Sequence, residues 1–450
     1  MAQLFGTDGV RGVANREITP ELAFRLGRAA AAVLAADVPR PRIVVGRDTR
    51  ASGEMLQAAL VAGFLSAGAH CLDAGVIPTP GVAYLTRQRQ AQAGAVISAS
   101  HNPIEDNGIK FFGPNGYKLS DELEARIEEL VLDLEQGRDE LPRPTGGGVG
   151  RLLTDTQAGN DYLDFLAATA RYPLNGLRIV VDTAYGAAFR LAPRLFTRLG
   201  ADVLALHLSP NGTNINVGCG STHPELAAEK VREEGADAGL TFDGDADRLI
   251  AIDEQGNVVD GDRILAICAL DRLRREDLPG RTVVATIYSN LGLRKALHDA
   301  GGELLITGAG DRQVMETLLA NNLVLGGEQS GHIVFLEHHT TGDGMLTAIQ
   351  LLDVMMRTGL RLSELAAQMP SFPQVLANVR VRTKEDWDKM PAVQEALTQA
   401  RATLGAEGEL NVRPSGTEPV IRVMAQGPER AAVETAVELV TRALEVSLGV

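Results

Sequence analysis

The sequence is poor in cysteine and has no long uninterrupted apolar run. Its 450 residues contain three scattered cysteines and no C-x-x-C pair. This odd number argues against a disulfide framework and is typical of free thiols in a reducing cytoplasm. The alanine-rich run near the N-terminus is interrupted by Arg25 and Arg28, so we expect no membrane-spanning helix and no membrane partner. The N-terminus lacks the basic and apolar segments of a signal peptide, which also favours a cytoplasmic protein.

Positive charge is scarce relative to negative charge. Lys and Arg number 43 against 58 Asp and Glu, which gives a formal net charge of -15. This acidic balance disfavours a broad surface for nucleic acid or anionic membranes, so we expect neither as a partner. An acidic protein that binds an anion needs cations gathered at the site. The sequence also has no G-x-x-x-x-G-K-[ST] motif, which argues against a Walker-type ATP site.

One pattern of strand, helix, glycine and strand occurs three times. The first strands of the three copies lie at 42–46, 177–181 and 281–285, and helices follow near 55–66, 188–199 and 291–300. Each copy is typical of a βαβ unit in a mostly parallel sheet. The last part of the chain differs, because its alternating strands and its helices at 391–404 and 428–447 favour an antiparallel α+β module.

Breaks in composition predict where the domains end. Residues 141–150 are rich in Pro and Gly, 253–257 form a polar turn, and 369–373 contain two prolines. We therefore predict an α/β protein of three similar α/β domains with mixed, mostly parallel sheets, followed by a smaller C-terminal α+β domain. The predicted domains are 1–150, 151–253, 254–370 and 371–450.

An apolar run that ends in a polar loop is the first candidate site. Residues 95–97 are typical of a short buried strand, and Ser100 and His101 follow it shortly before Pro103. Pro103 prevents the strand from continuing and disfavours a helix before it. Ligands bind at the carboxyl ends of strands in open α/β sheets, which favours a reactive site at these side chains. The alternative is an ordinary polar turn after a strand.

The segment 242–248, FDGDADR, carries Asp243, Asp245 and Asp247 between two apolar runs. In an extended backbone, carboxylates two residues apart point the same way. Three like charges held together repel one another unless a cation neutralises them, and oxygen ligands suit Mg²⁺. The segment therefore predicts a metal-binding loop.

Two alternatives for this segment are an EF-hand Ca²⁺ loop and a solvated acidic turn. Glu254 falls at the twelfth position of such a Ca²⁺ loop, but Arg248 occupies the position that requires glycine. The flanking runs also have the character of strands and not of helices. The pattern disfavours the Ca²⁺ loop.

Two glycine-containing loops have the composition of ligand sites. Residues 413–419, RPSGTEP, followed by Arg422, combine two prolines, two hydroxyls and arginine, which suits a phosphate that is held and not transferred. Residues 326–332, GGEQSGH, offer Glu328 and Ser330 for sugar hydroxyls, and glycine lets a backbone approach closely. A rigid hairpin with its arginine in solvent is the alternative for the first loop, and a lone histidine such as His332 is more often structural than catalytic.

Five motifs in this order resemble the α-D-phosphohexomutase family: FGTDGVRG, SASHNP with NGIK, FDGDADR, GEQSGH and RPSGTEP. The resemblance covers essentially the whole chain and implies four domains around a central cleft. Gln329 and the segment 210–223, PNGTNINVGCGSTH, resemble the branch of the family that acts on glucosamine phosphates. Ala246 replaces a glycine common in related metal loops, and we expect it to be tolerated because the carboxylates remain.

The resemblance implies an isomerase that interconverts glucosamine 6-phosphate and glucosamine 1-phosphate through a phosphoserine and glucosamine 1,6-bisphosphate. The product would enter amino-sugar nucleotide synthesis for the cell wall. The implied roles involve four groups of residues. Ser100 would be the phosphoserine and would hold one Mg²⁺ per chain with Asp243, Asp245 and Asp247. Proton transfer and charge near the moving phosphoryl group would come from Lys110, His101 and Arg11. The substrate would be bound by Arg248, Glu328, Ser330 and His332. The other phosphate would be held by Arg413, Ser415, Gly416, Thr417 and Arg422.

Several alternatives remain open at this point. A phosphomannomutase or phosphoglucomutase of the same family would use the same chemistry on another sugar. A phosphosugar-binding protein without catalysis, or a Ca²⁺-binding module, would belong to a different class. The expected partner is a small phosphosugar, and the chain is expected to be a monomer or a homodimer.

Overall fold

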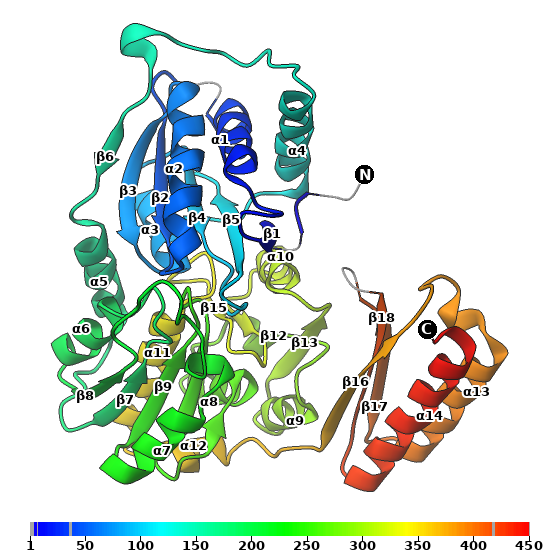
Figure 1. The fold of residues 1–450 in the computed structure, drawn as a ribbon. Coiled ribbons are helices and arrows are strands. Elements are labelled where there is room, and N and C mark those ends of the chain that lie inside the picture. Colours follow the sequence, from blue (N-terminus) through cyan, green and yellow to red (C-terminus); the bar gives the residue numbers. More distant parts are fainter. Residues whose placement is uncertain (1–3, 7, 36–37, 416–418, 450) are drawn as a thin grey trace.

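The structure is a computed structural model that describes residues 4–6, 8–35, 38–415 and 419–449. These described residues form four sheets, of which three lie close together while the fourth stands to one side (Figure 1). None of the helices in these ranges has the length and apolar character needed to cross a bilayer.

The first sheet is mixed and has six strands in the order β1-β5-β4-β2-β3-β6. Strand β2 pairs in parallel with β3 and β4, whereas β5 is antiparallel to its neighbours β4 and β1. Its last strand begins beyond residue 150, the predicted end of the first domain. The strands are β1 (Val10–Val13), β2 (Arg42–Arg47), β3 (His70–Val76), β4 (Ala93–Ile97), β5 (Asp106–Phe112) and β6 (Leu152–Thr154).

Helices cover both faces of this sheet. Ile43 and Val45 of β2 pack in a core with α1, α2 and α4, whereas Val44 faces the opposite side, where α3 lies. This alternation follows from the period of two along a strand. The helices are α1 (Pro20–Leu34), α2 (Ala51–Ser66), α3 (Thr79–Gln88) and α4 (Asp121–Glu135).

The second and third sheets have the strand orders β11-β10-β9-β7-β8 and β13-β12-β14-β15. Their strands are β7 (Arg178–Asp182), β8 (Asp202–Leu206), β9 (Ala238–Phe242), β10 (Leu249–Asp253), β11 (Val258–Val259), β12 (Thr282–Thr286), β13 (Glu303–Thr307), β14 (Leu325–Gly327) and β15 (Ile333–Phe335). Their helices are α5 (Ala158–Thr169), α6 (Leu191–Arg198), α7 (Glu225–Glu234), α8 (Gly261–Arg274), α9 (Leu291–Asp299), α10 (Asp311–Asn321), α11 (Gly344–Thr358) and α12 (Leu362–Ala366).

A single apolar core joins the first three sheets. It contains Val96 of β4, Leu166 of α5, Leu240 of β9 and Leu352 of α11, among many other buried side chains. Burial of apolar surface is the main favourable term in folding. The first three units therefore stabilise one another and hold their adjoining loops in fixed relative positions.

The C-terminal unit is an antiparallel α+β module, as the sequence predicted. Its sheet has the order β16-β18-β17, and its helices pack with the sheet in a separate apolar core. Its elements are β16 (Gln374–Arg380), α13 (Pro391–Leu404), β17 (Glu409–Pro414), β18 (Val420–Gln426) and α14 (Arg430–Leu448). The fold class predicted from the sequence is thus confirmed, with three α/β units and one α+β unit (Figure 1).

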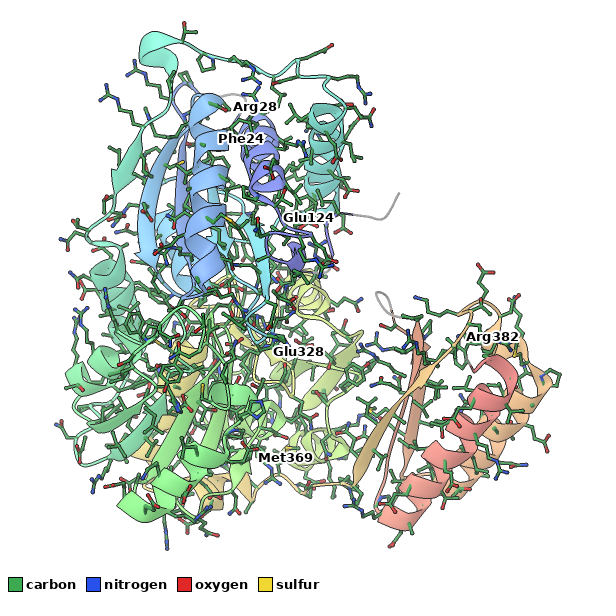
Figure 2. The ribbon with its side chains drawn as sticks, in the orientation of Figure 1. Phe24, Arg28, Glu124, Glu328, Met369 and Arg382 are labelled. Carbon is green, nitrogen blue, oxygen red and sulfur yellow. The ribbon has the colours of Figure 1, made fainter. Side chains whose placement is uncertain are left out.

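Helices α1 and α2 cross at two glycines, Gly27 and Gly63. A Cβ added at Gly63 would lie 2.3 Å from the carbonyl oxygen of Phe24, and one added at Gly27 would lie 2.3 Å from the carbonyl oxygen of Leu60. Figure 2 labels Phe24 and Arg28, one turn apart on α1. The backbones can come this close only because neither helix carries a side chain at the crossing.

We predict that Gly63→Ala lowers stability by about 2 kcal/mol, because the new methyl group must push two helix backbones apart. Thermal unfolding followed by circular dichroism measures this change. Gly53→Ala in the same helix is the matched control, since a Cβ there meets only the Arg47 side chain at 3.5 Å. Its higher helix propensity predicts a gain of up to about 1 kcal/mol. Equal melting temperatures for the two variants would contradict the close crossing.

Candidate active site

Ser100 lies in the loop between β4 and β5, at the carboxyl end of β4. Its side-chain hydroxyl donates a hydrogen bond to Oδ2 of Asp243 at 2.5 Å, and the residue is only 1% exposed. The backbone of Ser100 has φ of 52°, a left-handed conformation that is uncommon outside glycine. Nδ1 of His101 lies 3.4 Å from the same hydroxyl oxygen. The structure thus brings the predicted serine directly to the aspartate loop.

The aspartate loop is a tight turn, so the extended backbone in which alternate carboxylates would align is not what brings these three together. Strands β9 and β10 are antiparallel and pair Phe242 with Leu249, which leaves residues 243–248 to reverse the chain. Ala246 has φ of 56°, and its N–H donates to the carbonyl oxygen of Asp243 at 3.1 Å. The three carboxylates converge because the turn curls around them. This left-handed position also explains why glycine suits residue 246 in related loops.

The geometry of the three aspartates fits a hard divalent cation. All three are buried, and one oxygen of each lies within 4.8 Å of the others. Oδ1 of Asp245 and Oδ1 of Asp247 are buried without a hydrogen-bond partner in the described parts of the chain. Burial and the charges of the neighbouring aspartates raise the pKa of both Asp243 and Asp247 above the usual range. Oxygen ligands of this kind suit Mg²⁺, which would relieve their repulsion.

Lys110 neutralises Asp245, which lies between the other two aspartates in the sequence. Its ammonium group lies 3.2 Å from Oδ2 of Asp245 and 2.9 Å from Oδ2 of Asp8. Burial opposes ionisation of Asp245, but Lys110 and a hydrogen bond from Thr79 outweigh it and lower the pKa of Asp245. Burial likewise acts against the charge on Lys110, yet Asp245 and Asp8 raise the pKa of Lys110. Both partners are therefore charged at neutral pH.

This ion pair belongs to a longer chain of alternating charges that the sequence analysis missed. Lys118 forms ion pairs with both Asp8 and Asp311, and Arg11 forms an ion pair with Asp8. Asp311 follows a short segment with two glycines, 308–310. No spacing signal could have revealed the pair of Lys118 and Asp311, because these residues come from different domains.

Positive groups surround the imidazole of His101 and the metal loop. Burial lowers the pKa of His101 to about 4, and the guanidinium groups of Arg248 and Arg11 add to this effect. The backbone N–H of Arg248 donates to Oδ1 of Asp243 at 3.3 Å, and its Nε lies 3.8 Å from Oδ1 of Asp247. The structure therefore gathers Arg11, Lys110 and Arg248 around the aspartate loop, as expected for a site that binds phosphate.

The predicted sugar loop connects β14 and β15 in the third unit. Oε1 of Glu328 accepts a hydrogen bond from the N–H of Gly310 at 3.2 Å, and Ser330 is exposed. His332 is buried, and its Nε2 lies 3.8 Å from Oδ2 of Asp311. A cavity of about 480 Å³ is lined by Lys118, Asp311 and His332, among others, so the loop and the charge chain share one opening. Figure 2 labels Glu328 in the region between the first and third units.

The predicted phosphate loop belongs to the C-terminal unit. Arg413 and Arg422 are opposite one another on β17 and β18, and the guanidinium of Arg413 stacks 4.9 Å from the centre of the Tyr288 ring. Ser415 is buried, and its carbonyl oxygen accepts a hydrogen bond from Lys384 at 2.7 Å. Gly416 and Thr417 lie outside the described residues. Arginine forms bidentate pairs with phosphate, so two arginines on neighbouring strands suit a position that takes up an anion.

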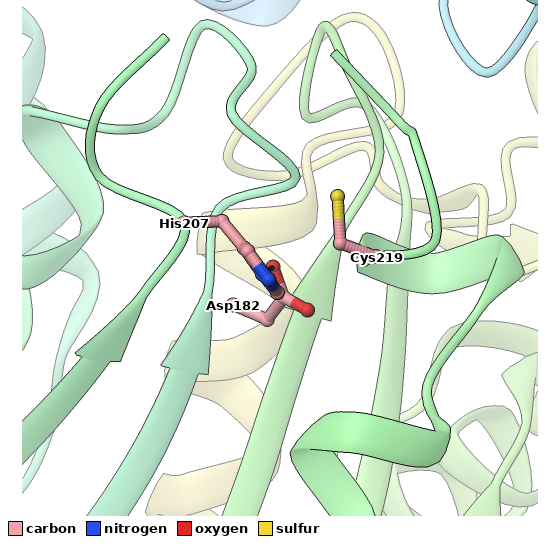
Figure 3. Close-up of side chains that lie close together, drawn as sticks. All are labelled: Asp182, His207 and Cys219. Carbon is pink, nitrogen blue, oxygen red and sulfur yellow. Dashed lines mark hydrogen bonds and ion pairs between the residues drawn. The ribbon is translucent and has the colours of Figure 1, made fainter. Parts of the chain in front are cut away.

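A second group of possible metal ligands, Asp182, His207 and Cys219, lies at the carboxyl ends of β7 and β8 (Figure 3). Oδ1 of Asp182 lies 2.7 Å from Nδ1 of His207, and its Oδ2 accepts the N–H of Gly220 at 2.9 Å. Burial and the charge of Asp182 raise the pKa of the Cys219 thiol to about 12. The carboxylate is already occupied by protein donors and the thiol is neutral, so we assign this group to holding its loops in place.

Comparisons with known sequence families cover nearly the whole chain. The family descriptions that match are "Phosphoglucomutase/phosphomannomutase, alpha/beta/alpha domain I" at residues 2–138, domain II at 160–256, domain III at 260–372 and "C-terminal domain" at 376–443. Every predicted site residue lies within one of these four segments. The order of the four matches is that of the four sheets in the structure.

Individual relatives point the same way. A phosphoglucosamine mutase of Moorella thermoacetica is 57% identical over 434 residues, which are 96% of this chain and 97% of that protein. The solved structure of a phosphoglucomutase/phosphomannomutase family protein from Burkholderia thailandensis is 25% identical, has a TM-score of 0.83 and covers 100% of this chain and 99% of its own. An N-acetylphosphoglucosamine mutase of Aspergillus fumigatus, solved with GlcNAc-6P and magnesium, shares the fold at 18% identity with a TM-score of 0.69, covering 98% of this chain and 95% of its own.

The resemblance inferred from the five motifs is confirmed by these matches in sequence and in fold. The buried serine, the aspartate turn and the loops around them lie in the matching domains. The chain belongs to the phosphoglucomutase/phosphomannomutase family of α-D-phosphohexomutases.

Proposed function

We propose that this protein interconverts glucosamine 6-phosphate and glucosamine 1-phosphate, since relatives at 52% to 57% identity are named phosphoglucosamine mutase. The observation that carries the proposal is the Ser100 hydroxyl, buried and hydrogen-bonded to Asp243 in a turn that holds three aspartates. A hydroxyl beside such a cluster suits a phosphoryl group that is carried on serine and balanced by a cation.

In the proposed reaction, phospho-Ser100 gives its phosphoryl group to O1 of glucosamine 6-phosphate. The bond from phosphorus to the serine oxygen breaks and the bond to O1 forms, while the O1 proton leaves and the serine oxygen takes up a proton. The glucosamine 1,6-bisphosphate then turns around, and the phosphoryl group on O6 returns to Ser100, whose hydroxyl proton leaves while O6 takes up a proton. Glucosamine 1-phosphate is released, and the enzyme is phosphorylated again. We propose Lys110 and His101 as the candidates for carrying the proton, with Arg11 beside them.

The aspartates and the phosphoserine would together hold the metal. Asp243, Asp245 and Asp247 supply three buried oxygens, and a phosphate oxygen on Ser100 would supply another. A bound Mg²⁺ would contribute positive charge where negative charge develops on the transferring group. Lys110 already balances Asp245, so the cation would mainly balance the other two carboxylates.

The remaining predicted residues would hold the substrate. We propose that Glu328, Ser330 and His332 bind the sugar, with Arg248 near the transferring phosphoryl group. The loop that contains Arg413, Ser415, Gly416, Thr417 and Arg422 would hold the other phosphate.

All three cysteines are free and buried, which supports our expectation of a reducing cytoplasm.

The second candidate substrate is another hexose phosphate. Gln329 is the residue that suggested glucosamine, and its side chain contacts protein groups. Its Nε2 lies 3.4 Å from Oδ2 of Asp260 and 3.4 Å from Oε1 of Gln374. The residue that suggested glucosamine thus has partners in the protein in this conformation. Comparing rates on glucosamine, glucose and mannose 1-phosphates tests the choice of sugar, and faster turnover of either neutral sugar would favour the second candidate.

We predict that Ser100→Ala loses mutase activity by at least about 10³-fold, because the acceptor of the phosphoryl group is removed. Intact-mass spectrometry of the purified parent is expected to show a phosphate adduct that is absent from the variant. The control is Ser209→Ala at an exposed serine, which should keep both the adduct and the activity. An active Ser100→Ala variant would refute the proposed reaction.

We predict opposite effects of Asp247→Asn on the stability of the metal-free and metal-bound protein. Burial and Asp245 raise the pKa of Asp247, so its ionised form destabilises the folded state once the pH exceeds its unfolded pKa. The neutral amide removes this penalty, and the metal-free variant should melt above the parent at pH 7.5. Addition of Mg²⁺ should raise the melting temperature of the parent but not of the variant.

Differential scanning calorimetry with and without Mg²⁺ measures both effects. Asp388→Asn is the matched control, because Asp388 is exposed and far from the aspartate turn in sequence. That variant should melt like the parent in both conditions. A rise with Mg²⁺ in Asp247→Asn as large as in the parent would show that the cation binds elsewhere.

A further inference from the structure

We propose that Asn216 is a positioning residue for phosphoryl transfer: its side-chain amide, which comes from the second domain, holds the backbone of Ser100 in the conformation that points the hydroxyl at Asp243. This inference rests on the proposed function and extends it to the segment 210–223, which the sequence singled out and which no step so far uses. It concerns a contact with the serine peptide and not with the sugar.

The backbone of Ser100 needs outside support. A left-handed conformation in a residue other than glycine costs about 1–2 kcal/mol and persists only where its surroundings enforce it. Both ends of the residue are held: its N–H donates to the hydroxyl oxygen of Ser98 at 2.9 Å. Its carbonyl oxygen accepts Nη2 of Arg50 at 3.0 Å and Nδ2 of Asn216 at 2.8 Å.

Arg50 supplies the support from within the first domain. It is 1% exposed, and its guanidinium also donates to the carbonyl oxygens of Asn102 at 2.8 Å and Asp106 at 3.0 Å. Asp48 pairs with it at 3.0 Å. The loop therefore wraps around a buried cation, and its removal would leave several buried carbonyl groups unpaired. Arg50 holds the whole loop, which makes it a poor residue for testing one peptide.

Asn216 supplies the support from the second domain, and its Nδ2 lies closest to the Ser100 carbonyl oxygen, at 2.8 Å, with the carbonyl oxygen of Asn102 farther away at 3.5 Å. Its own backbone is left-handed, with φ of 60°, and its N–H donates to the carbonyl oxygen of Ala184 at 3.0 Å. Asparagine tolerates this conformation better than most residues. The same segment is tied to the first domain a second time, because the N–H of Ala51 donates to the carbonyl oxygen of Gly212 at 2.9 Å.

The aspartate turn presses against the same carbonyl group. A Cβ added at Gly244 would lie 2.6 Å from the carbonyl oxygen of Ser100 and 3.0 Å from Nδ2 of Asn216. The Ser100 peptide is thus enclosed by Arg50, Asn216 and the turn that carries Asp243. A backbone change that takes Ser100 out of the left-handed region would move the hydroxyl relative to Asp243, so the amide of Asn216 acts on the reacting oxygen through the backbone.

The variants Asn216→Asp and Asn216→Gly test this role in the full-length protein. Glycine keeps the left-handed backbone and removes only the donor, whereas aspartate places an acceptor against the Ser100 carbonyl oxygen. We expect kcat for glucosamine 6-phosphate to fall by about 10-fold to 100-fold, with the larger fall for Asn216→Asp, because small misplacements of reacting groups are this costly. KM should change by less than about twofold, since the sugar contacts are left in place.

Asn322→Gly is the matched control for the loss of a left-handed asparagine. Asn322 is exposed, has φ of 53° and ends α10. This control should keep the kcat of the parent, and its melting temperature gives the effect of the same substitution on folding alone. A parent that does not turn over glucosamine phosphates refutes the proposed function, whereas an active parent with Asn216 variants of unchanged kcat refutes the inference alone.

A crystal structure of Asn216→Asp provides a readout that does not depend on the substrate. We expect Ser100 to leave the left-handed region and its hydroxyl to separate from Asp243. A Ser100 backbone unchanged in φ, with the hydroxyl still on Asp243, would overturn the inference even if kcat had fallen. A fall in KM and kcat together with a drop in melting temperature well beyond that of Asn322→Gly would instead show a general structural role, which also contradicts it.

Discussion

The hydrogen bond between Ser100 and Asp243 joins two domains, and the remainder of the site depends on it. Its partners are 143 residues apart and lie at the ends of different sheets. Phosphoryl transfer relies on positioning and electrostatics, so a serine that drifts from its cation loses both. The left-handed Ser100 peptide cannot be held by its own loop alone, because that conformation is intrinsically unfavourable. The apolar core shared by the first three units keeps the two loops at a fixed separation.

Electrostatics divide the three aspartates into two kinds. Asp245 has a permanent cation, Lys110, and its pKa is lowered despite burial. Asp243 and Asp247 repel each other in a buried turn, and their pKa values are raised. Asp243 and Asp247 beside the serine therefore carry negative charge that Lys110 does not balance, because Lys110 is paired with Asp245 and Asp8. A divalent cation would complete this balance, whereas another lysine would fill the place of the phosphate in the proposed reaction.

The sequence predicted the fold class and the local elements well, since both follow from short-range patterns. Helix α13 has the predicted bounds, and the three βαβ units and the aspartate loop are where the patterns placed them. Three alternate carboxylates would align in an extended backbone, but Ala246 is left-handed and turns the chain, and the only hint of this in the sequence is that related loops commonly have glycine at that position. Contacts such as Arg50 with the Ser100 loop and Lys118 with Asp311 join distant segments, so no spacing rule could have revealed them.

The first three units meet one another through apolar contacts, whereas the C-terminal unit meets the third unit through polar ones. This difference bears on which part of the molecule can move. The first three units share one core, and separating them would expose much apolar surface to water. The C-terminal unit has its own core and meets the third unit through polar contacts, such as Arg413 with Tyr288 and Gln426 with the N–H of Leu291. Such hydrogen bonds exchange for bonds to water at a small net change in free energy. In the proposed reaction the bisphosphate must turn around, and a rotation of the C-terminal unit would give it room while Ser100 and Asp243 stay together. The apolar contacts would then keep the serine beside the aspartates, and the polar contacts would let the C-terminal unit move.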